Sequence, residues 1–207
     1  MMIVIQICGV PKMRYDADHK QKTHKKVVME AAKAIRQKGP DKIGVAAIMA
    51  KAGLTHGGFY AHFKSKDDLV AEAIDYMFED RMALLRKALS ATDPAKGLHD
   101  YIDLYLSPLH RDRRDRGCPV VALSGDVARM AQQAQRRFEA GVQAMTGALA
   151  DLLRKLGHQQ AEGLATSIFF EMVGALAVAR AIADSAQSLA ILEQARASVK
   201  QRLGLLH

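Results

Sequence analysis

Apolar residues recur at helical spacing along most of the chain, and no comparable stretch alternates apolar and polar positions as a strand does. The pattern predicts an all-α protein, with three helices in an N-terminal DNA-binding head and the others in a C-terminal bundle. The predicted longer helices cover residues 20–37, 65–89, 132–156, 160–183 and 189–203. Shorter helices are predicted at 45–51, just after Thr55, at 98–106 and from Pro119 onward.

Residues 45–63 predict two short helices separated by a tight turn. Val45, Ile48 and Met49 share one face of the first helix, and Gly53 can take the positive φ that such a turn needs. Thr55 stands where the N-cap of the second helix belongs. Two short helices joined in this way form a helix-turn-helix, which presents its second helix to the major groove of DNA.

Residues 48–69, IMAKAGLTHGGFYAHFKSKDDL, resemble the DNA-binding signature of the TetR/AcrR family of one-component repressors. The segment from Gly117 to Leu123 is similar to a subgroup of the same family. One departure is Gly44, where the family usually has a Ser or Thr that caps the helix and can touch a phosphate. The resemblance implies a homodimeric, ligand-responsive repressor whose body dimerises and holds a small-molecule effector.

Side chains at the start of the second helix are the candidates for base contacts, because that end meets base edges in helix-turn-helix proteins. The resemblance implies that Tyr60, His62, Lys64 and Lys66 contact phosphates. Phe59 and Phe63 are expected in the core instead. The predicted DNA contacts are Gly44, Val45, Thr55, His56, Gly57, Gly58, Tyr60, His62, Lys64 and Lys66.

Positive charge is concentrated at the N-terminal end. Residues 1–64 hold twelve Lys and Arg against four Asp and Glu, and residues 65–207 hold eighteen of each, so the first segment carries the whole net charge of +8. A basic head on a neutral body is typical of a nucleic-acid-binding domain joined to a domain with another task. We expect residues 20–64 to form the DNA-binding domain and residues 65–207 the ligand-binding and dimerisation domain. Residues 1–19 are expected to be a disordered extension, from an upstream start site or an expression remnant.

Two further sites are predicted in the body. The helix from Ser65 continues directly from the head, so an effector among nearby apolar side chains would act on the DNA-binding unit through it. The last two helices are apolar enough to form a four-helix interface with a second copy. The predicted effector pocket comprises Met77, Tyr101, Tyr105, Val121, Met145, Phe169 and Met172. The predicted dimer contacts are Ala175, Leu176, Ala179 and Leu192.

No motif for an enzyme, a cofactor or a metal ion occurs, and the two cysteines suggest a reducing cytoplasm rather than a disulfide scaffold. The most apolar helix carries Glu171 and Arg180, which argues against a membrane span. Residues 110–116 are interpreted as a solvated, mixed-charge loop.

Three alternatives remain at this point. A basic architectural DNA-binding protein would have no effector and little sequence preference. An enzyme with an accidental helix-turn-helix match would show turnover. Cys118 is a possible reactive thiol, because it precedes a helix beside three arginines, but a small buried packing residue would have the same sequence.

Overall fold

The computed structural model describes the backbone of residues 12–205, with side chains from residue 18 onward. This part of the chain contains nine α-helices and three 3-10 helices and no strand, which confirms the all-α class. The elements are α1 (Lys12–Lys38), α2 (Val45–Lys51), η1 (His56–Ala61), α3 (Lys66–Leu89), α4 (Pro94–Tyr105), α5 (Pro108–Asp112), η2 (Arg114–Arg116), α6 (Pro119–Leu123), η3 (Val127–Arg129), α7 (Gln132–Lys155), α8 (Ala161–Ala181) and α9 (Ser185–Arg202).

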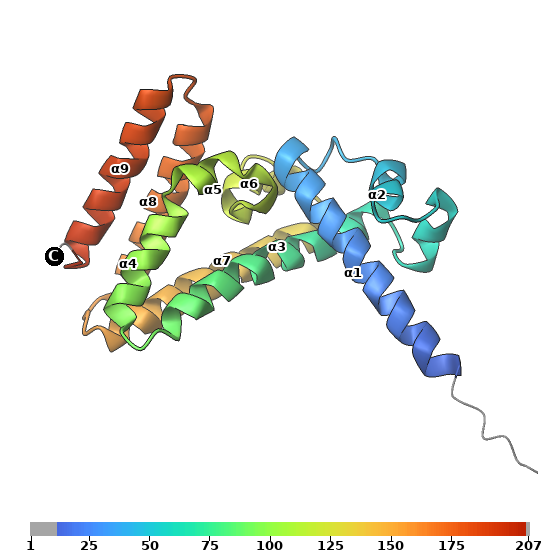
Figure 1. Ribbon diagram of the computed structural model, residues 1–207, viewed down its shortest axis with the longest axis horizontal. Helices are drawn as coiled ribbons and strands as arrows, with labels where there is room; N and C mark the ends of the chain where they lie inside the picture. Colours follow the sequence, from blue (N-terminus) through green and yellow to red (C-terminus); the bar gives the residue numbers. More distant parts are fainter. Residues whose placement is uncertain (1–11, 206–207) are drawn as a thin grey trace, which may run out of the picture.

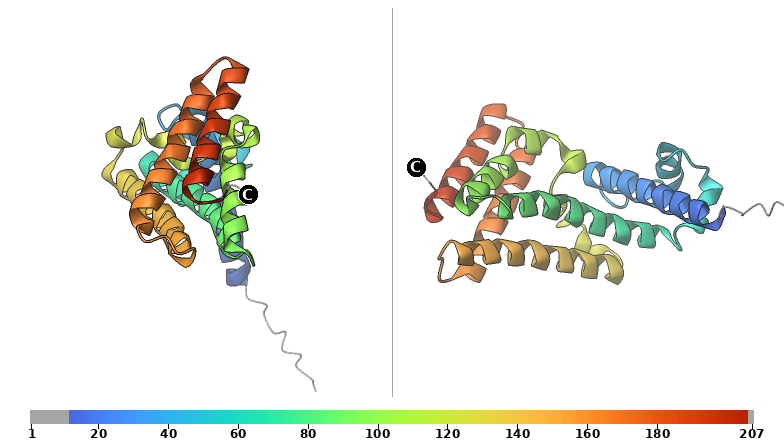
Figure 2. Two further views of the ribbon diagram at one scale, coloured as in Figure 1. Left: turned by 90° about the vertical axis from the view of Figure 1, so that its left-hand side faces the viewer. Right: turned by 60° about the horizontal axis from the view of Figure 1, so that its bottom comes forward.

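The long helices α3 and α7 lie side by side and form the long axis of the molecule (Figure 1). The head, which consists of α1, α2 and η1, lies at one end of this axis. Helices α8 and α9 form an antiparallel pair at the other end, with α4 beside α9 (Figure 2). Helix α3 therefore begins at the head and ends in the body.

Helix α1 begins at Lys12, eight residues before the predicted start. Residues 12–38 contain neither Pro nor Gly, and nothing in this segment ends a helix. The prediction of an extension over residues 1–19 therefore overlaps α1, whereas residues 1–11, with Cys8, lie outside the described residues. Val27, Ala31 and Ile35 are fully buried, as their helical spacing predicts.

The start of α3 is fixed by a capping box. The Ser65 hydroxyl oxygen accepts a hydrogen bond from the backbone N–H of Asp68 at 3.1 Å. The Asp68 carboxylate in turn accepts one from the Lys64 N–H, also at 3.1 Å. These bonds satisfy backbone donors on both sides of the helix start, which makes the connection between the head and α3 well defined.

Three predictions for the middle and end of the chain were wrong. Helix α4 begins at Pro94 because the Asp93 carboxylate accepts two backbone N–H groups, and α9 begins at Ser185 because Asp184 caps it. Residues 110–116 do not form a loop, because α5 extends to Asp112 and η2 covers Arg114–Arg116. Most of the segment is exposed, as predicted, but His110 is buried.

Helix α8 is buried along one side only. Leu176, Ala179 and, on α9, Leu192 are at most 1% exposed within the single chain, so they pack inside their own protomer. Ala175 is half-buried. The prediction that these four residues form the dimer contact is therefore wrong for the three buried ones. The outer side of α8 instead exposes Phe170 and Val178, by 46% and 48%.

Candidate DNA interface and ligand cavity

The turn between α2 and η1 has the geometry of a helix-turn-helix. Gly53 has a φ of 80°, in the left-handed region that favours glycine. The Gly53 N–H donates to the Ala50 carbonyl at 3.0 Å and the Leu54 N–H to the Met49 carbonyl at 2.9 Å, which closes α2. The next helix then leaves in a new direction.

The second helix of the unit is a 3-10 helix rather than an α-helix. Thr55 occupies its N-cap position, but its side chain makes no capping hydrogen bond. Its hydroxyl and the exposed His56 side chain are therefore available to an external partner. A Cβ added to Gly57 would meet nothing within 4 Å, so packing inside the protein does not require glycine there.

Aromatic residues divide between the core and the surface as predicted. Phe59 and Phe63 are each 2% exposed, and their rings stack at 5.4 Å between centroids. Tyr60, between them in the sequence, is 74% exposed. The buried pair holds η1 against α1 and α2, and the exposed tyrosine adds a hydrogen-bonding group to the outer surface.

His62 differs from the other predicted contacts because it is half-buried. Its Nδ1 is buried without a hydrogen-bond partner among the described residues, and its ring lies 5.9 Å from that of His24. Burial, followed by the nearby His24 and Lys20, lowers the pKa of His62. Only its other ring nitrogen is left for a phosphate contact.

The remaining predicted contacts lie at the N-terminal ends of α2 and α3. Gly44 is the exposed N-cap of α2 and offers no side chain, while Val45 is half-buried against the core. Lys64 is exposed, whereas the Lys66 ammonium donates to the Asp41 carbonyl at 3.2 Å. Of the two lysines, Lys64 is thus the one with its charge turned to solvent.

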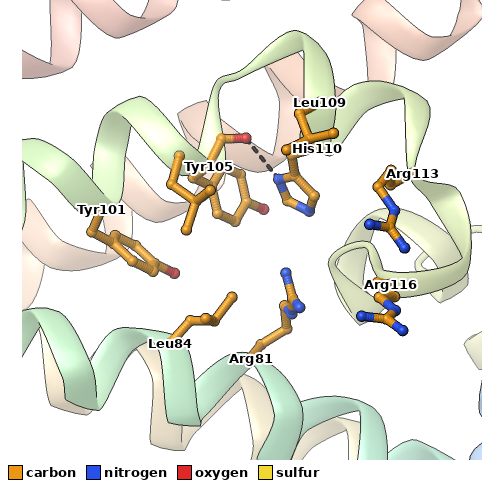
Figure 3. A pocket seen from close by; sticks show the side chains of 9 residues that line it. Arg81, Leu84, Tyr101, Tyr105, Leu109, His110, Arg113 and Arg116 are labelled. Atoms are coloured by element: carbon orange, nitrogen blue, oxygen red, sulfur yellow. Dashed lines mark hydrogen bonds between the residues drawn. The ribbon is translucent and has the colours of Figure 1, made fainter.

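A cavity of about 180 Å³ lies in the body between α3, α4, α5 and η2. Arg81 and Leu84 come from α3, and Arg113 and Arg116 come from the end of α5 and from η2 (Figure 3). Its complete lining is Arg81, Leu84, Tyr101, Leu104, Tyr105, Leu109, His110, Arg113 and Arg116.

Tyr101 and Tyr105 are the predicted pocket residues that line this cavity. Four others, Met77, Met145, Phe169 and Met172, are at most 2% exposed and belong to the hydrophobic core, and Val121 packs against that core. Apolar spacing identified buried positions but could not distinguish a cavity wall from solid core. The missed signal was the arginine-rich segment 110–116, because its exposed Arg113 and Arg116 also line the cavity.

His110 is held in one neutral state. Its Nδ1 lies 2.7 Å from the Tyr105 carbonyl, to which it donates (Figure 3). Its Nε2 accepts a hydrogen bond from the Cys118 N–H at 3.2 Å. Burial lowers the pKa of His110 to about 4. Both ring nitrogens are thus used inside the protein, and the imidazole carries no charge near pH 7.

Cys118, the N-cap of α6, is 2% exposed. Burial raises the pKa of the Tyr105 phenol, and the nearby Cys118 sulfur adds to that rise. The predicted helix N-terminus is therefore present, but the thiol is not open to solvent, and α6 has only five residues.

Comparison with known proteins agrees with these features. Residues 28–73 match the family model described as bacterial regulatory proteins, tetR family. Residues 94–195 match the model of the LmrA/YxaF-like transcriptional regulator C-terminal domain. The chain belongs to the TetR family of transcriptional regulators. Members of the TetR family are DNA-binding regulators and not enzymes, in agreement with the sequence-based prediction.

Individual relatives of this TetR-family chain are distant. It is 24% identical over 192 residues to the HTH-type transcriptional regulator TtgR of Pseudomonas putida, an alignment that spans 88% of this chain and 91% of that protein. A TetR regulator from Chloroflexus aurantiacus has a TM-score of 0.76 at 23% identity, over 90% of this chain and 96% of its own. The reduced form of NemR from E. coli has a TM-score of 0.75 at 19% identity, over 87% of this chain and 97% of its own. These likenesses show the shared fold.

Helix α8 of this TetR-family chain is long and apolar enough to span a membrane by composition, with a mean hydropathy of 1.5. Its ionised groups are nevertheless paired within the protein: Glu171 pairs with Arg202, and Arg180 donates to the carbonyls of His110 and Arg111. Such a helix is equally typical of a protein core. Among the described residues, no three His, Cys, Asp or Glu side chains gather where they could hold a metal ion.

Proposed function

We propose that the protein is a ligand-responsive repressor that binds a near-palindromic operator as a homodimer in the cytoplasm. A small molecule in the cavity between α3, α4, α5 and η2 releases it from DNA. The single observation that carries this proposal is a carboxylate oxygen shared between the head and the cavity. Asp80 Oδ2 accepts from Arg36 of α1 at 3.2 Å and from Arg81, which lines the cavity, at 3.1 Å.

Arg36 supports a direct route from the cavity to the head. Its side chain is 2% exposed, and it also donates to the carbonyls of Met77 at 3.2 Å and Asp115 at 3.4 Å. Burial lowers the pKa of Arg36, and Asp80 opposes that shift. A ligand that draws Arg81 or η2 toward itself weakens the contacts of Arg36, and the loss of partners is strongly destabilising for a buried cation. The head then adjusts through α1 as well as through α3.

The DNA-binding surface would consist of exposed and half-buried residues of the head. Thr55 and His56 would meet base edges, with Gly57 and Gly58 allowing close approach, and Tyr60, His62, Lys64 and Lys66 would contact phosphates. Two heads related by a two-fold axis require half-sites about 34 Å apart, one turn of the duplex.

The outer side of α8 supports a dimer. It exposes Phe170 and Val178, separated by Gly174, along the far end of the molecule from the head. Small residues between two apolar ones allow a second helix to approach closely. We therefore assign the dimer contact to this exposed side of α8 together with the neighbouring side of α9, in place of the buried residues.

Selection of bound duplexes from a random pool, followed by affinity measurements, tests the DNA-binding part. The Lys64→Ala variant should bind every duplex more weakly, and the slope of log K against log salt should fall by about 0.9, one phosphate contact. Lys155→Ala is the matched control, because Lys155 is an exposed lysine at the far end of α7. Equal salt slopes for the two variants would refute the assignment.

The effector part has its own test, which also separates the alternatives. By linkage, an effector that weakens operator binding must itself bind more weakly to the DNA complex, by the same factor. An architectural protein would select no sequence and release DNA for no compound. A thiol sensor would lose its response in Cys118→Ser, whereas a cavity-based sensor would keep it.

A further inference from the structure

The lining of the cavity is divided into a cationic side and an apolar side. Arg113 and Arg116 lie on one side, Tyr101 and Leu84 lie on the opposite side, and Arg81 extends from α3 between them (Figure 3). Leu104 and Leu109, at 45% and 61% exposure, add apolar surface that water reaches. A ligand that matched this lining would be negative at one end and apolar at the other.

Carboxylates of the protein neutralise the three arginines only in part. Arg81 is bonded to Asp80, which Arg36 also uses, and its Nε is buried without a partner among the described residues. Arg116 has an ion pair with Asp115 at 3.9 Å. Among the described side chains, no Asp or Glu lines the cavity itself. The cationic side therefore retains capacity for an anion.

Two further groups agree with an anionic ligand. The Tyr105 hydroxyl lines the cavity and is buried, and apart from the nearby Cys118 sulfur it has no hydrogen-bond partner among residues 18–205. Burial raises the pKa of Tyr105, so this hydroxyl keeps its proton and can donate it. His110 is neutral, with both nitrogens already bonded, so the charge of the cavity comes from arginine alone.

We infer that the cavity binds a small apolar monocarboxylate, with its carboxylate against Arg81, Arg113 and Arg116 and its hydrocarbon part against Tyr101 and Leu84. Guanidinium groups bind carboxylates through paired, charge-assisted hydrogen bonds. A cavity of about 180 Å³ has room for roughly one six-membered ring. This inference rests on the proposed function, since it names the chemical class of the effector.

Calorimetric titration of the DNA-free protein tests the inference with three acids and their amides: benzoate, phenylacetate and hexanoate against benzamide, phenylacetamide and hexanamide. At least one acid should bind about tenfold or more tightly than its amide, the usual worth of a charge-assisted hydrogen bond. Inorganic phosphate should bind more weakly than that acid, because it cannot use the apolar side.

Variants locate the site. Arg113→Gln and Arg116→Gln, both at exposed positions, should each weaken binding of the acid about tenfold. Arg136→Gln is the matched control, because Arg136 is an exposed arginine on α7 outside the cavity, and it should leave the affinity within about twofold.

Three results would overturn the inference: no acid binds better than its amide, phosphate binds as tightly as the acids, or the Arg113 and Arg116 variants behave as Arg136→Gln does. Failure of the proposed function gives a different result. In that case the acid binds and the variants weaken it, but operator affinity is the same with and without the acid.

Discussion

Gly141 on α7 provides a quantitative test of the packing that holds α3 in place. A Cβ added there would lie 2.3 Å from two ring atoms of Phe78 and 2.6 Å from a third. Carbon atoms in good contact are about 3.5–4.0 Å apart, so the ring or one of the helices must move by more than about 1 Å. Gly141 thus sets how closely α7 approaches α3.

The magnitude follows from two opposing contributions. Overpacking of this kind costs about 1–3 kcal/mol, and replacing a helical glycine with alanine contributes about 1 kcal/mol of stability. Gly147 lies on the same helix, and a Cβ added there meets nothing within 4 Å, so Gly147→Ala keeps only the gain. We expect Gly141→Ala to be about 1–3 kcal/mol less stable than Gly147→Ala.

Thermal and urea unfolding at one fixed protomer concentration measure this difference, because the stability of the proposed dimer would depend on concentration. For a chain of this size, each kcal/mol corresponds to about 2–4 °C in Tm. Phe78→Leu should remove part of the penalty in the Gly141→Ala background. Equal stabilisation by Gly141→Ala and Gly147→Ala would show that α3 and α7 do not pack as described.

Three other predictions concern pH, assembly and the thiol. The pKa of His110 is about 4 in the folded protein and about 6.5 in the unfolded chain, so the free energy of unfolding should be highest above pH 6.5 and fall by at most about 3 kcal/mol toward pH 4. The His110→Gln variant should lack this decrease, and a pH profile identical to that of the wild type would contradict the prediction. Val178→Glu should give folded monomers in sedimentation experiments, whereas Gln133→Glu, at an exposed position of α7, should leave the assembly unchanged. A monomeric wild type at micromolar concentration would exclude the interface. Cys118 should react with iodoacetamide far more slowly than a free thiol, as measured by peptide mass, because it is 2% exposed; rapid labelling would restore the sensor hypothesis.

The head could be predicted from the sequence because its signals are local. The turn at Gly53, the cap at Ser65 and the alternation of buried Phe59 with exposed Tyr60 each depend on a few neighbouring residues. Even there, the sequence did not distinguish a 3-10 helix at η1 from an α-helix, because a six-residue segment is too short for its period to show.

The cavity could not be predicted in the same way, because its walls come from segments far apart in the chain. Arg81 and Arg116 lie thirty-five positions apart and line one cavity only because η2 packs beside α1, which in turn packs against α3. The burial of His110 depends on the Tyr105 carbonyl and on Arg180 of α8, which no local pattern reveals. The dimer contacts failed for a related reason: apolar spacing marked α8 as buried, but not which side its own chain covers.

The fixed state of His110 has a consequence for how a cell could use this protein. Arginine side chains remain charged at every pH a cell experiences, His110 loses its proton near pH 4, and burial raises the pKa values of Tyr101 and Tyr105. The net charge of the cavity walls therefore does not change between about pH 5 and pH 9. If the cavity holds the proposed effector, any change of its binding with pH in this range must come from ionisation of the effector, so the protein would report the concentration of one protonation form of that molecule and not the pH of its surroundings.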